Sequence, residues 1–363
     1  MNILIDIGHP AHVHLYRNFY FEMKARGHNL HVTVKNLPSA MRLLDLYGIP
    51  YIQLGTKGDT LTAKAFRQVD FSMRIAGIAR RFGIDIGLGS SISLAHASKF
   101  SRMKSVIFDD DDDQVQPLMT RFGHPFADLI VSPSSLEHAR ASRKALFYPG
   151  YHELAYLHPA RFTADPGVLD DAGISPGERF FIMRFNAFRA HHDKGVTGLT
   201  SEQKISLVKL LEPYGRVLIT TEAETETELL PYRLKVAPDR AHSLLSYATM
   251  FIGDSQTMTS EAAVLGVPAL RCNTLAGSIS YLREEEETYG LTYAYKPTEF
   301  DRLLEKIASL LNNPGLHEEW QRRRRVMLGD KIDVTAFMVW LTEAYREKRE
   351  LAEFQEIDFN RFK

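Results

Sequence analysis

The feature that most constrains this chain is a repeated alternation of short apolar runs with helix-like segments. In the first part of the chain, the apolar runs lie at 2–8, 29–34, 51–54, 84–89, 104–108 and 129–131. The pattern starts again further along, with runs at 179–185, 216–220, 234–237, 250–252, 268–272 and 292–295. Strands separated by helices of this length are joined by crossover connections, so the pattern predicts parallel sheets covered by helices.

A length of 363 residues exceeds the size at which a single hydrophobic core usually stops growing. Between the two series of runs lies an interval rich in Pro, Gly and Asp that has no periodicity of its own. We therefore predict an α/β protein with two doubly wound, Rossmann-type domains. The predicted boundaries are an N-terminal domain at 1–150, a linker at 151–178, a C-terminal domain at 179–331, and a C-terminal helix at 332–363 that could pack back on the first domain.

Composition narrows the class of partner. Lys and Arg number 44 against 45 Asp and Glu, so the chain as a whole has no electrostatic reason to bind nucleic acid. The single cysteine, Cys272, cannot form an internal disulfide or a cysteine-rich metal site, and it fits a reducing compartment. The first residues enter an apolar strand directly, and we expect neither a signal peptide nor a membrane span. Cytoplasmic residence follows as an expectation.

The second series contains the segment GDSQTMTSEAAVLGVPALR at 253–271, in which a buried strand turns into a helix. At the carboxyl end of a parallel strand, the helix N-terminus presents unpaired N–H groups that suit a phosphate. Ser255, Gln256 and Thr257 occupy that place, and Glu261, about one turn later, could accept hydrogen bonds from a ribose. The alternative is that Ser and Thr only cap the helix and that Glu261 offsets its dipole.

This segment resembles the donor site of nucleotide-sugar enzymes with the GT-B fold, and also the corresponding segment of the UDP-GlcNAc 2-epimerases. Together with GHPAHVHLYRNF and YPGYHELAYLHP, it makes the chain similar to an uncharacterised GT-B-like family associated with surface polysaccharides. The resemblance spans nearly the whole chain. It implies two domains with a cleft between them: an acceptor-side N-terminal domain, and a C-terminal domain that binds a nucleotide-diphosphate sugar, most simply of the UDP type.

The same resemblance assigns roles in the donor segment. By residue match, Ser255, Gln256 and Thr257 face the phosphates and Glu261 meets the ribose, although Asp254 to Gln256 replace a more glycine-rich turn. The stretch RFNAFRAHHDKG at 184–195 resembles the His-Arg loop of the 2-epimerases, which implies that Arg184 and His192, or else His191, contact the diphosphate. Arg240 or His242 is a supporting candidate. A surface loop without a role is the alternative for that stretch.

Two histidines near the N-terminus carry acid–base potential. His9 and His12 follow the first apolar run, and imidazole titrates near neutral pH, as a general base must. The stretch resembles the loop GGHVFPAL of the peptidoglycan GlcNAc transferases, which aligns His12 with the loop histidine. We predict His12, or else His9, as a catalytic or acceptor-site residue, and Glu153 in YHELAYL as a secondary acid–base candidate.

Five aspartates at 109–113 follow the fifth apolar run. Because like charges repel, such a run belongs in a solvated loop or beside a cation. Asp109 and Asp110 lie nearest the strand and are our active-site candidates, with a hydrated acidic loop as the alternative. GT-B enzymes as a class generally need no metal for the donor, so we predict no obligatory metal or other cofactor and leave weak Mg²⁺ association open.

The predicted function is a glycosyltransferase of cell-surface polysaccharide or glycolipid assembly, which uses a nucleotide sugar as donor and a sugar or lipid-linked acceptor. One alternative is a 2-epimerase-like enzyme, which needs no acceptor, and another is a catalytically silent nucleotide-sugar-binding protein. The run QRRRRV at 321–326 is typical of a solvated helix face, but it could contact the anionic inner face of a membrane. A homodimer stays open.

Overall fold

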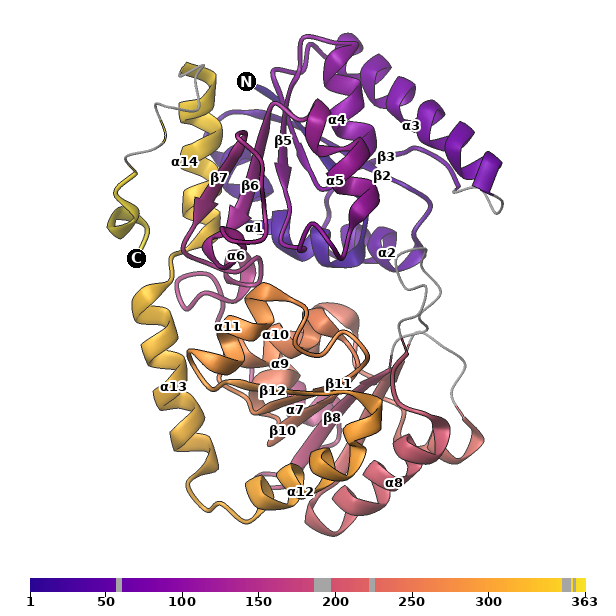
Figure 1. Cartoon of the computed structure of the whole chain (residues 1–363), viewed down its shortest axis with the longest axis vertical. Coiled ribbons are helices and arrows are strands. Elements are labelled where there is room, and N and C mark those ends of the chain that lie inside the picture. Colours follow the sequence, from indigo (N-terminus) through magenta and orange to yellow (C-terminus); the bar gives the residue numbers. More distant parts are fainter. Residues whose placement is uncertain (57–60, 186–196, 222–225, 348–353, 355–356) are drawn as a thin grey trace. The chain divides into compact units, whose positions relative to one another are not determined.

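The computed structural model describes residues 1–56, 61–185, 197–221, 226–347, 354 and 357–363. The chain forms two compact units, which we describe separately (Figure 1). The first unit consists of Met1–Arg161 and Lys331–Lys363, and the second of Phe162–Asp330. The segment at 151–178 is therefore divided, because its first eleven residues belong to the first unit and the rest to the second.

The first unit is built on a seven-stranded sheet with the strand order β3-β2-β1-β4-β5-β6-β7. Its neighbouring strands are paired in parallel, and β1 runs in register with β2 from Asn2 opposite Asn29 to Ile7 opposite Val34. Central strands of a parallel sheet are buried on both faces, which explains why these runs are almost continuously apolar. The strands are β1 (Asn2–Ile7), β2 (Asn29–Val34), β3 (Ile52–Gln53), β4 (Ile86–Gly89), β5 (Lys104–Phe108), β6 (Leu129–Pro133) and β7 (Ala145–Tyr148).

Helices cover this sheet in two groups. One core cluster joins side chains of β1, β5 and β6 to side chains of α3, α4 and α5. On the other side, α1 packs against α2, α6 and the C-terminal α14, so the end of the chain belongs to the first unit (Figure 1). The helices are α1 (Pro10–Ala25), α2 (Pro38–Leu46), α3 (Leu61–Arg81), α4 (Ile92–Lys99), α5 (Pro117–Phe122), α6 (Leu154–Leu157) and α14 (Val334–Glu347).

The second unit is built on a five-stranded sheet with the order β12-β11-β10-β8-β9, again with parallel neighbours. The strands are β8 (Phe180–Phe185), β9 (Arg216–Thr221), β10 (Met250–Gly253), β11 (Ala269–Cys272) and β12 (Thr292–Tyr295). The helices are α7 (Val168–Asp171), α8 (Ser201–Leu211), α9 (Ala241–Tyr247), α10 (Gln256–Leu265), α11 (Ser280–Glu287), α12 (Phe300–Leu311) and α13 (Leu316–Asp330). Gly266, with a φ of 74°, ends α10 in the left-handed conformation that glycine adopts without strain.

The predicted fold class is confirmed, because both units are parallel sheets with interleaved helices. One expected strand is wrong: 234–237 lies outside the strands, and only an isolated bridge from Ile219 to Arg233 precedes it. Pro238 follows directly and starts a short 3₁₀ turn, Pro238–Arg240, and proline cannot extend a strand ladder. In the part of the chain that is described, no helix is both long and apolar enough to cross a membrane.

We predict that Gly253→Ala destabilises the second unit by about 1–3 kcal/mol, the usual cost of overpacking. A Cβ at Gly253 would lie 2.3 Å from the carbonyl oxygen of Arg184, which belongs to the neighbouring strand β8. Gly329→Ala is the matched control, because a Cβ there meets nothing within 4 Å. Urea unfolding of the two variants measures the difference. Equal midpoints would contradict the close approach of β8 and β10.

Candidate active site

Each sheet has one point at which the winding of the chain changes direction. In the first unit this point lies between β1 and β4, because β1 to β3 extend the sheet one way and β4 to β7 the other. In the second unit it lies between β10 and β8. Ligands of open α/β sheets bind at such switch points, beside the carboxyl ends of the strands. The residues after these strands therefore form the ligand-facing edge of their own unit.

In the second unit, this edge contains the start of α10. Ser255 is the N-cap, and its hydroxyl oxygen accepts a hydrogen bond from the N–H of Met258 at 3.4 Å. Gln256 and Thr257 are the first helical residues and are partly exposed. Ser255 therefore performs the capping role that was the alternative to phosphate contact, while the helix N-terminus itself stays at the switch point.

Glu261 is buried one turn further along α10. Its Oε1 atom lies 2.9 Å from Nε2 of His242, which is in the first turn of α9. Both side chains are at least nine-tenths buried, so each fixes the orientation of the other. The sequence prediction assigned Glu261 to a ribose and named His242 separately as a supporting candidate, without pairing the two.

The predicted basic residues of the second unit separate into different places. Arg184 is in β8, opposite Gly253 in the register, and its Nη1 donates to Thr220 Oγ1 at 2.9 Å. Arg240 instead binds two carboxylates, those of Asp165 at 2.9 Å and Asp171 at 2.8 Å. His192 lies outside the described residues. Of the two predicted arginines, Arg184 and Arg240, it is therefore Arg184 that lies beside the switch point of the second sheet.

The arginine run of α13 contacts its own unit. Arg322 and Arg323 both form ion pairs with Glu319. Arg324 donates to the carbonyl oxygen of Val264 at 2.8 Å, and its pKa is lowered by burial. The Arg324 contact joins α13 to α10, and together these contacts leave less of the run available to a surface partner than the sequence pattern indicates.

In the first unit, His9 and His12 follow β1 as expected, but both use their Nδ1 atoms locally. The exposed His9 caps α1, and its Nδ1 accepts from the N–H of Ala11 at 3.2 Å. The Nδ1 of His12 accepts from the N–H of Gly8 at 3.3 Å. Burial lowers the pKa of His12 to about 3, and the neighbouring His9 and His152 add to the effect. His12 is therefore neutral near pH 7, with its proton on Nε2.

The acidic run is not a hydrated surface loop. Asp109 is 5% exposed, and its Oδ2 lies 2.7 Å from Nε2 of His124 and 3.0 Å from the guanidinium of Arg140. Arg140 also pairs with Asp113 at 3.1 Å and donates to the backbone oxygen of Asp109 at 2.8 Å. Asp109 thus belongs to a buried ion network that fixes the loop after β5.

Asp110 faces a different partner, His152, which follows β7. The Oδ2 of Asp110 lies 3.1 Å from Nδ1 of His152. Burial raises the pKa of Asp110, but the charge and hydrogen bond of His152 outweigh burial and lower it. Burial likewise lowers the pKa of His152, but attraction to Asp110 outweighs burial and raises it. Nε2 of His152 is buried without a hydrogen-bond partner among the described residues.

Two neighbours of this pair complete the cluster. Glu153, also predicted from the sequence, is 2% exposed and lies next to His152 in the chain. The hydroxyl of Tyr148, at the end of β7, is fully buried, and the described residues offer it no hydrogen-bond partner. Burial raises the pKa of Tyr148, and the charges of Asp110 and Glu153 raise it further. Tyr148 therefore keeps its proton and is a hydrogen-bond donor.

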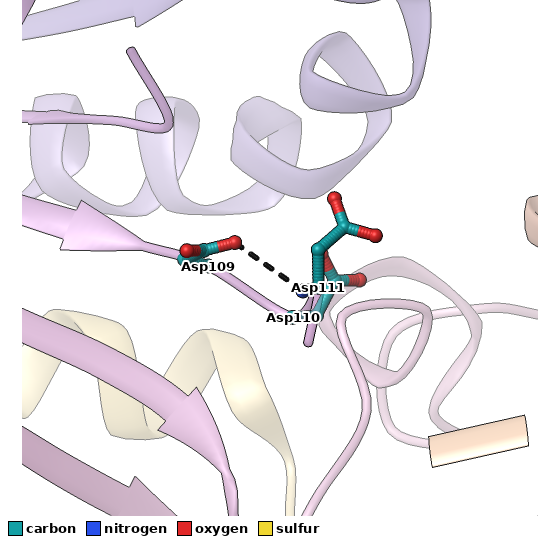
Figure 2. A group of neighbouring side chains, drawn as sticks. All are labelled: Asp109, Asp110 and Asp111. Atoms are coloured by element: carbon teal, nitrogen blue, oxygen red, sulfur yellow. Dashed lines mark hydrogen bonds between the residues drawn. The ribbon is translucent and has the colours of Figure 1, made fainter. Parts of the chain in front are cut away.

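The first three aspartates are close enough to share a cation. One carboxylate oxygen from each of Asp109, Asp110 and Asp111 lies within 4.8 Å of the others. Figure 2 shows the three side chains and the hydrogen bond that the Asp109 carboxylate accepts from the N–H of Asp111. Protein cations already face Asp109 and Asp110, however. Burial, and the negative charges of Asp110 and Asp109, raise the pKa of Asp111 well above its ordinary value, which favours its neutral form. We assign no metal to this cluster.

Comparisons with known proteins support the fold. Residues 1–290 match the sequence profile of a family described as "Protein of unknown function (DUF354)". The chain is 21% identical over 311 residues to an uncharacterised protein of Methanocaldococcus jannaschii, which covers 79% of this chain and 86% of that protein.

Solved structures with the GT-B fold are similar over nearly the whole chain. A UDP-GlcNAc 2-epimerase from Neisseria meningitidis bound to UDP-GlcNAc has a TM-score of 0.70 at 13% identity, with 95% of this chain and 100% of that chain covered. The spinosyn forosaminyltransferase SpnP has a TM-score of 0.65 at 16% identity, with 96% and 100% covered. At such identities the likeness shows the fold alone.

Proposed function

We propose that this chain, which belongs to the DUF354 family of proteins of unknown function, is an enzyme that acts on a nucleotide sugar. The observation that carries the proposal is the cluster of buried and half-buried ionisable side chains at the carboxyl edge of the first sheet. His12, Asp110, His152 and Glu153 reach this edge from the ends of three different strands. Burying such groups costs free energy, and perturbed groups of this kind concentrate at sites of proton transfer.

The second unit supports the nucleotide part of the proposal. Its switch point places the start of the ten-residue helix α10 beside β8, where the helix N-terminus suits a diphosphate. Arg184 lies across from Gly253 at the same edge. Glu261, oriented by His242, is our candidate for contact with the ribose. The Neisseria epimerase of the same fold was solved with UDP-GlcNAc, which makes a UDP-type donor the first to test.

We infer that the reaction is glycosyl transfer, in the assembly of a cell-surface polysaccharide or glycolipid. A base of the first unit takes the proton of an acceptor hydroxyl, whose oxygen then forms a bond to the anomeric carbon of the donor. The bond between that carbon and the diphosphate oxygen breaks, and the nucleoside diphosphate leaves with the electron pair. The start of α10 stabilises the negative charge that develops there.

A second candidate is epimerisation at carbon 2 of the sugar, because the first unit collects several carboxylates in one cluster. Asp110, Asp111 and Glu153 all lie there with His152. Such a reaction needs acid–base groups around the sugar ring and no acceptor. Incubation with a nucleotide sugar alone separates the candidates. An epimerase changes the sugar, whereas a transferase releases the nucleoside diphosphate faster when an acceptor is added.

The proposal predicts that a matching nucleotide sugar raises the Tm of the wild type by several degrees. Ligand at 100 times its Kd contributes about 2.7 kcal/mol of stability. In Glu261→Gln, which keeps a hydrogen-bond acceptor for His242, we expect the shift to fall by at least half. Exposed Glu305→Gln is the control and should keep the full shift. A thermal-shift screen of UDP, dTDP, GDP and CDP sugars makes the measurement, and no shift with any of them would refute the nucleotide-sugar proposal.

A further inference from the structure

We infer that His152 is the base that takes the acceptor proton, that Asp110 orients it, and that the reacting group of the acceptor is a neutral sugar hydroxyl. This inference rests on the proposed function and names the residue and the substrate class for its first-unit site. His12, predicted from the sequence as the base, does not combine a carboxylate on one ring nitrogen with an acceptor atom on the other, because its Nδ1 accepts the N–H of Gly8.

The geometry of the pair supports this role. Nδ1 of His152 lies 3.1 Å from the Asp110 carboxylate, which accepts hydrogen bonds when it is ionised, so the proton of neutral His152 resides on Nδ1. The lone pair of Nε2 is then the acceptor. That atom is buried and lacks a hydrogen-bond partner in the described part of the chain. A base held by a carboxylate on its far nitrogen is the general arrangement of enzymes that deprotonate hydroxyl groups.

The other candidates are already engaged. Oδ2 of Asp109 lies 2.7 Å from Nε2 of His124 and 3.0 Å from the guanidinium of Arg140, and its Oδ1 accepts the N–H of Asp111. His12 accepts a backbone N–H at Nδ1, and its remaining nitrogen therefore carries a proton that it can only donate. Exposed His9 uses Nδ1 to cap α1.

The charges that face His152 favour its protonation once a hydroxyl proton arrives. Asp110 contacts it directly, and Asp109 attracts its positive form from the same loop. His12, from the start of α1, is the opposing group, but it is neutral near pH 7. The imidazolium that proton transfer creates is therefore stabilised where it forms.

The negative charges around His152 also determine which chemical class of acceptor group can bind there. Asp110 and Glu153 would repel a phosphate or carboxylate at this point. The buried hydroxyl of Tyr148 also lacks a partner among the described residues, and it lies within the field of Asp110. A sugar hydroxyl is neutral and can approach Nε2 of His152 without this repulsion. An anionic group could not do this without a cost in free energy.

The test compares His152→Gln with His138→Gln, a change of the same kind at an exposed position. The assay is release of nucleoside diphosphate from the sugar donor that gives the largest thermal shift, with added monosaccharides or water as acceptor. We expect a 10²- to 10⁴-fold lower kcat for His152→Gln, the usual contribution of a general base, and an unchanged nucleotide-induced Tm shift. Asp110→Asn should also lower kcat, because it allows the wrong tautomer, and should move the acid limb of the pH–rate profile. His138→Gln should match the wild type.

Three outcomes overturn the inference. If His152→Gln keeps its kcat within threefold while the wild type is active, the base is another group and the nucleotide-sugar function still stands. If His152→Gln loses its Tm and its ligand shift in parallel with activity, the role of His152 is structural. If the wild type binds no nucleotide sugar and turns none over, the proposed function fails and this inference fails with it.

Discussion

Replacing Arg140 by Met is expected to lower the free energy of unfolding of the first unit by about 3–5 kcal/mol. The Arg140 side chain is fully buried between Asp109 and Asp113, and its guanidinium also donates to backbone oxygens of the acidic loop. Methionine fills a similar volume but has no charge and no donor. Asp109 would then be buried, and Asp113 half-buried, without this cation, and the loss of one partner of a buried pair costs more than the pair contributes.

Urea unfolding, followed by circular dichroism, measures this effect. Arg143→Met is the matched control, since Arg143 is exposed and the change should stay within about 0.5 kcal/mol. The double variant Arg140→Met with Asp109→Asn should recover part of the loss, because it removes the charge that the single variant leaves unpaired. An Arg140→Met protein as stable as the control would show that the acidic loop is hydrated, which is the alternative that the sequence left open.

The parallel sheets could be predicted because their signal is local. Each strand is a short apolar run between helix-like segments, and β1, β5 and β10 were all visible in this way. The exceptions have physical reasons. Strand β7 is only four residues long and is followed by Pro149 and Gly150, and the sequence pattern predicts no strand there. His152 is missed for the same reason, because a residue after an unpredicted strand is not expected at the ligand-facing edge.

The candidate site was only half predictable, because its chemistry depends on pairs that are distant in the sequence. Asp109 and Asp110 look equivalent in a run of five aspartates. In the folded chain they have different partners. Asp109 pairs with Arg140, 31 residues further along the sequence, and Asp110 pairs with His152. The available signal for His152 is a histidine four residues after the last strand of this sheet, next to the predicted candidate Glu153.

The second large effect that we expect is a loss of stability on acidification that depends on His12. In the folded protein, burial lowers the pKa of His12 from 6.5 to about 3, whereas in the unfolded chain it stays near its ordinary value. Between these two pH values the unfolded state binds a proton that the folded state does not. Stability due to neutral His12 is therefore complete above pH 6.5 and is lost progressively as the pH falls toward 3.

The full separation of the two pKa values corresponds to about 5 kcal/mol, at about 1.4 kcal/mol for each pH unit. Because His12 is partly accessible to solvent, we expect roughly half of this. His152 acts in the opposite sense, since its pKa is raised and its charged form stabilises the fold at low pH. The contribution of His12 must therefore be isolated by comparison with His12→Asn, whose Oδ1 can still accept the N–H of Gly8 and which never becomes charged.

Urea unfolding of the wild type and His12→Asn at pH 7.5, 6.0 and 5.0 gives the two stability curves. We expect the wild type to lose about 1–2 kcal/mol more than His12→Asn over this range, and exposed His138→Asn to follow the wild type. Parallel curves for wild type and His12→Asn would mean that folded His12 takes up a proton near its ordinary pKa. His12 would then be a candidate for the base again, and the argument for His152 as the base instead of His12 would fail.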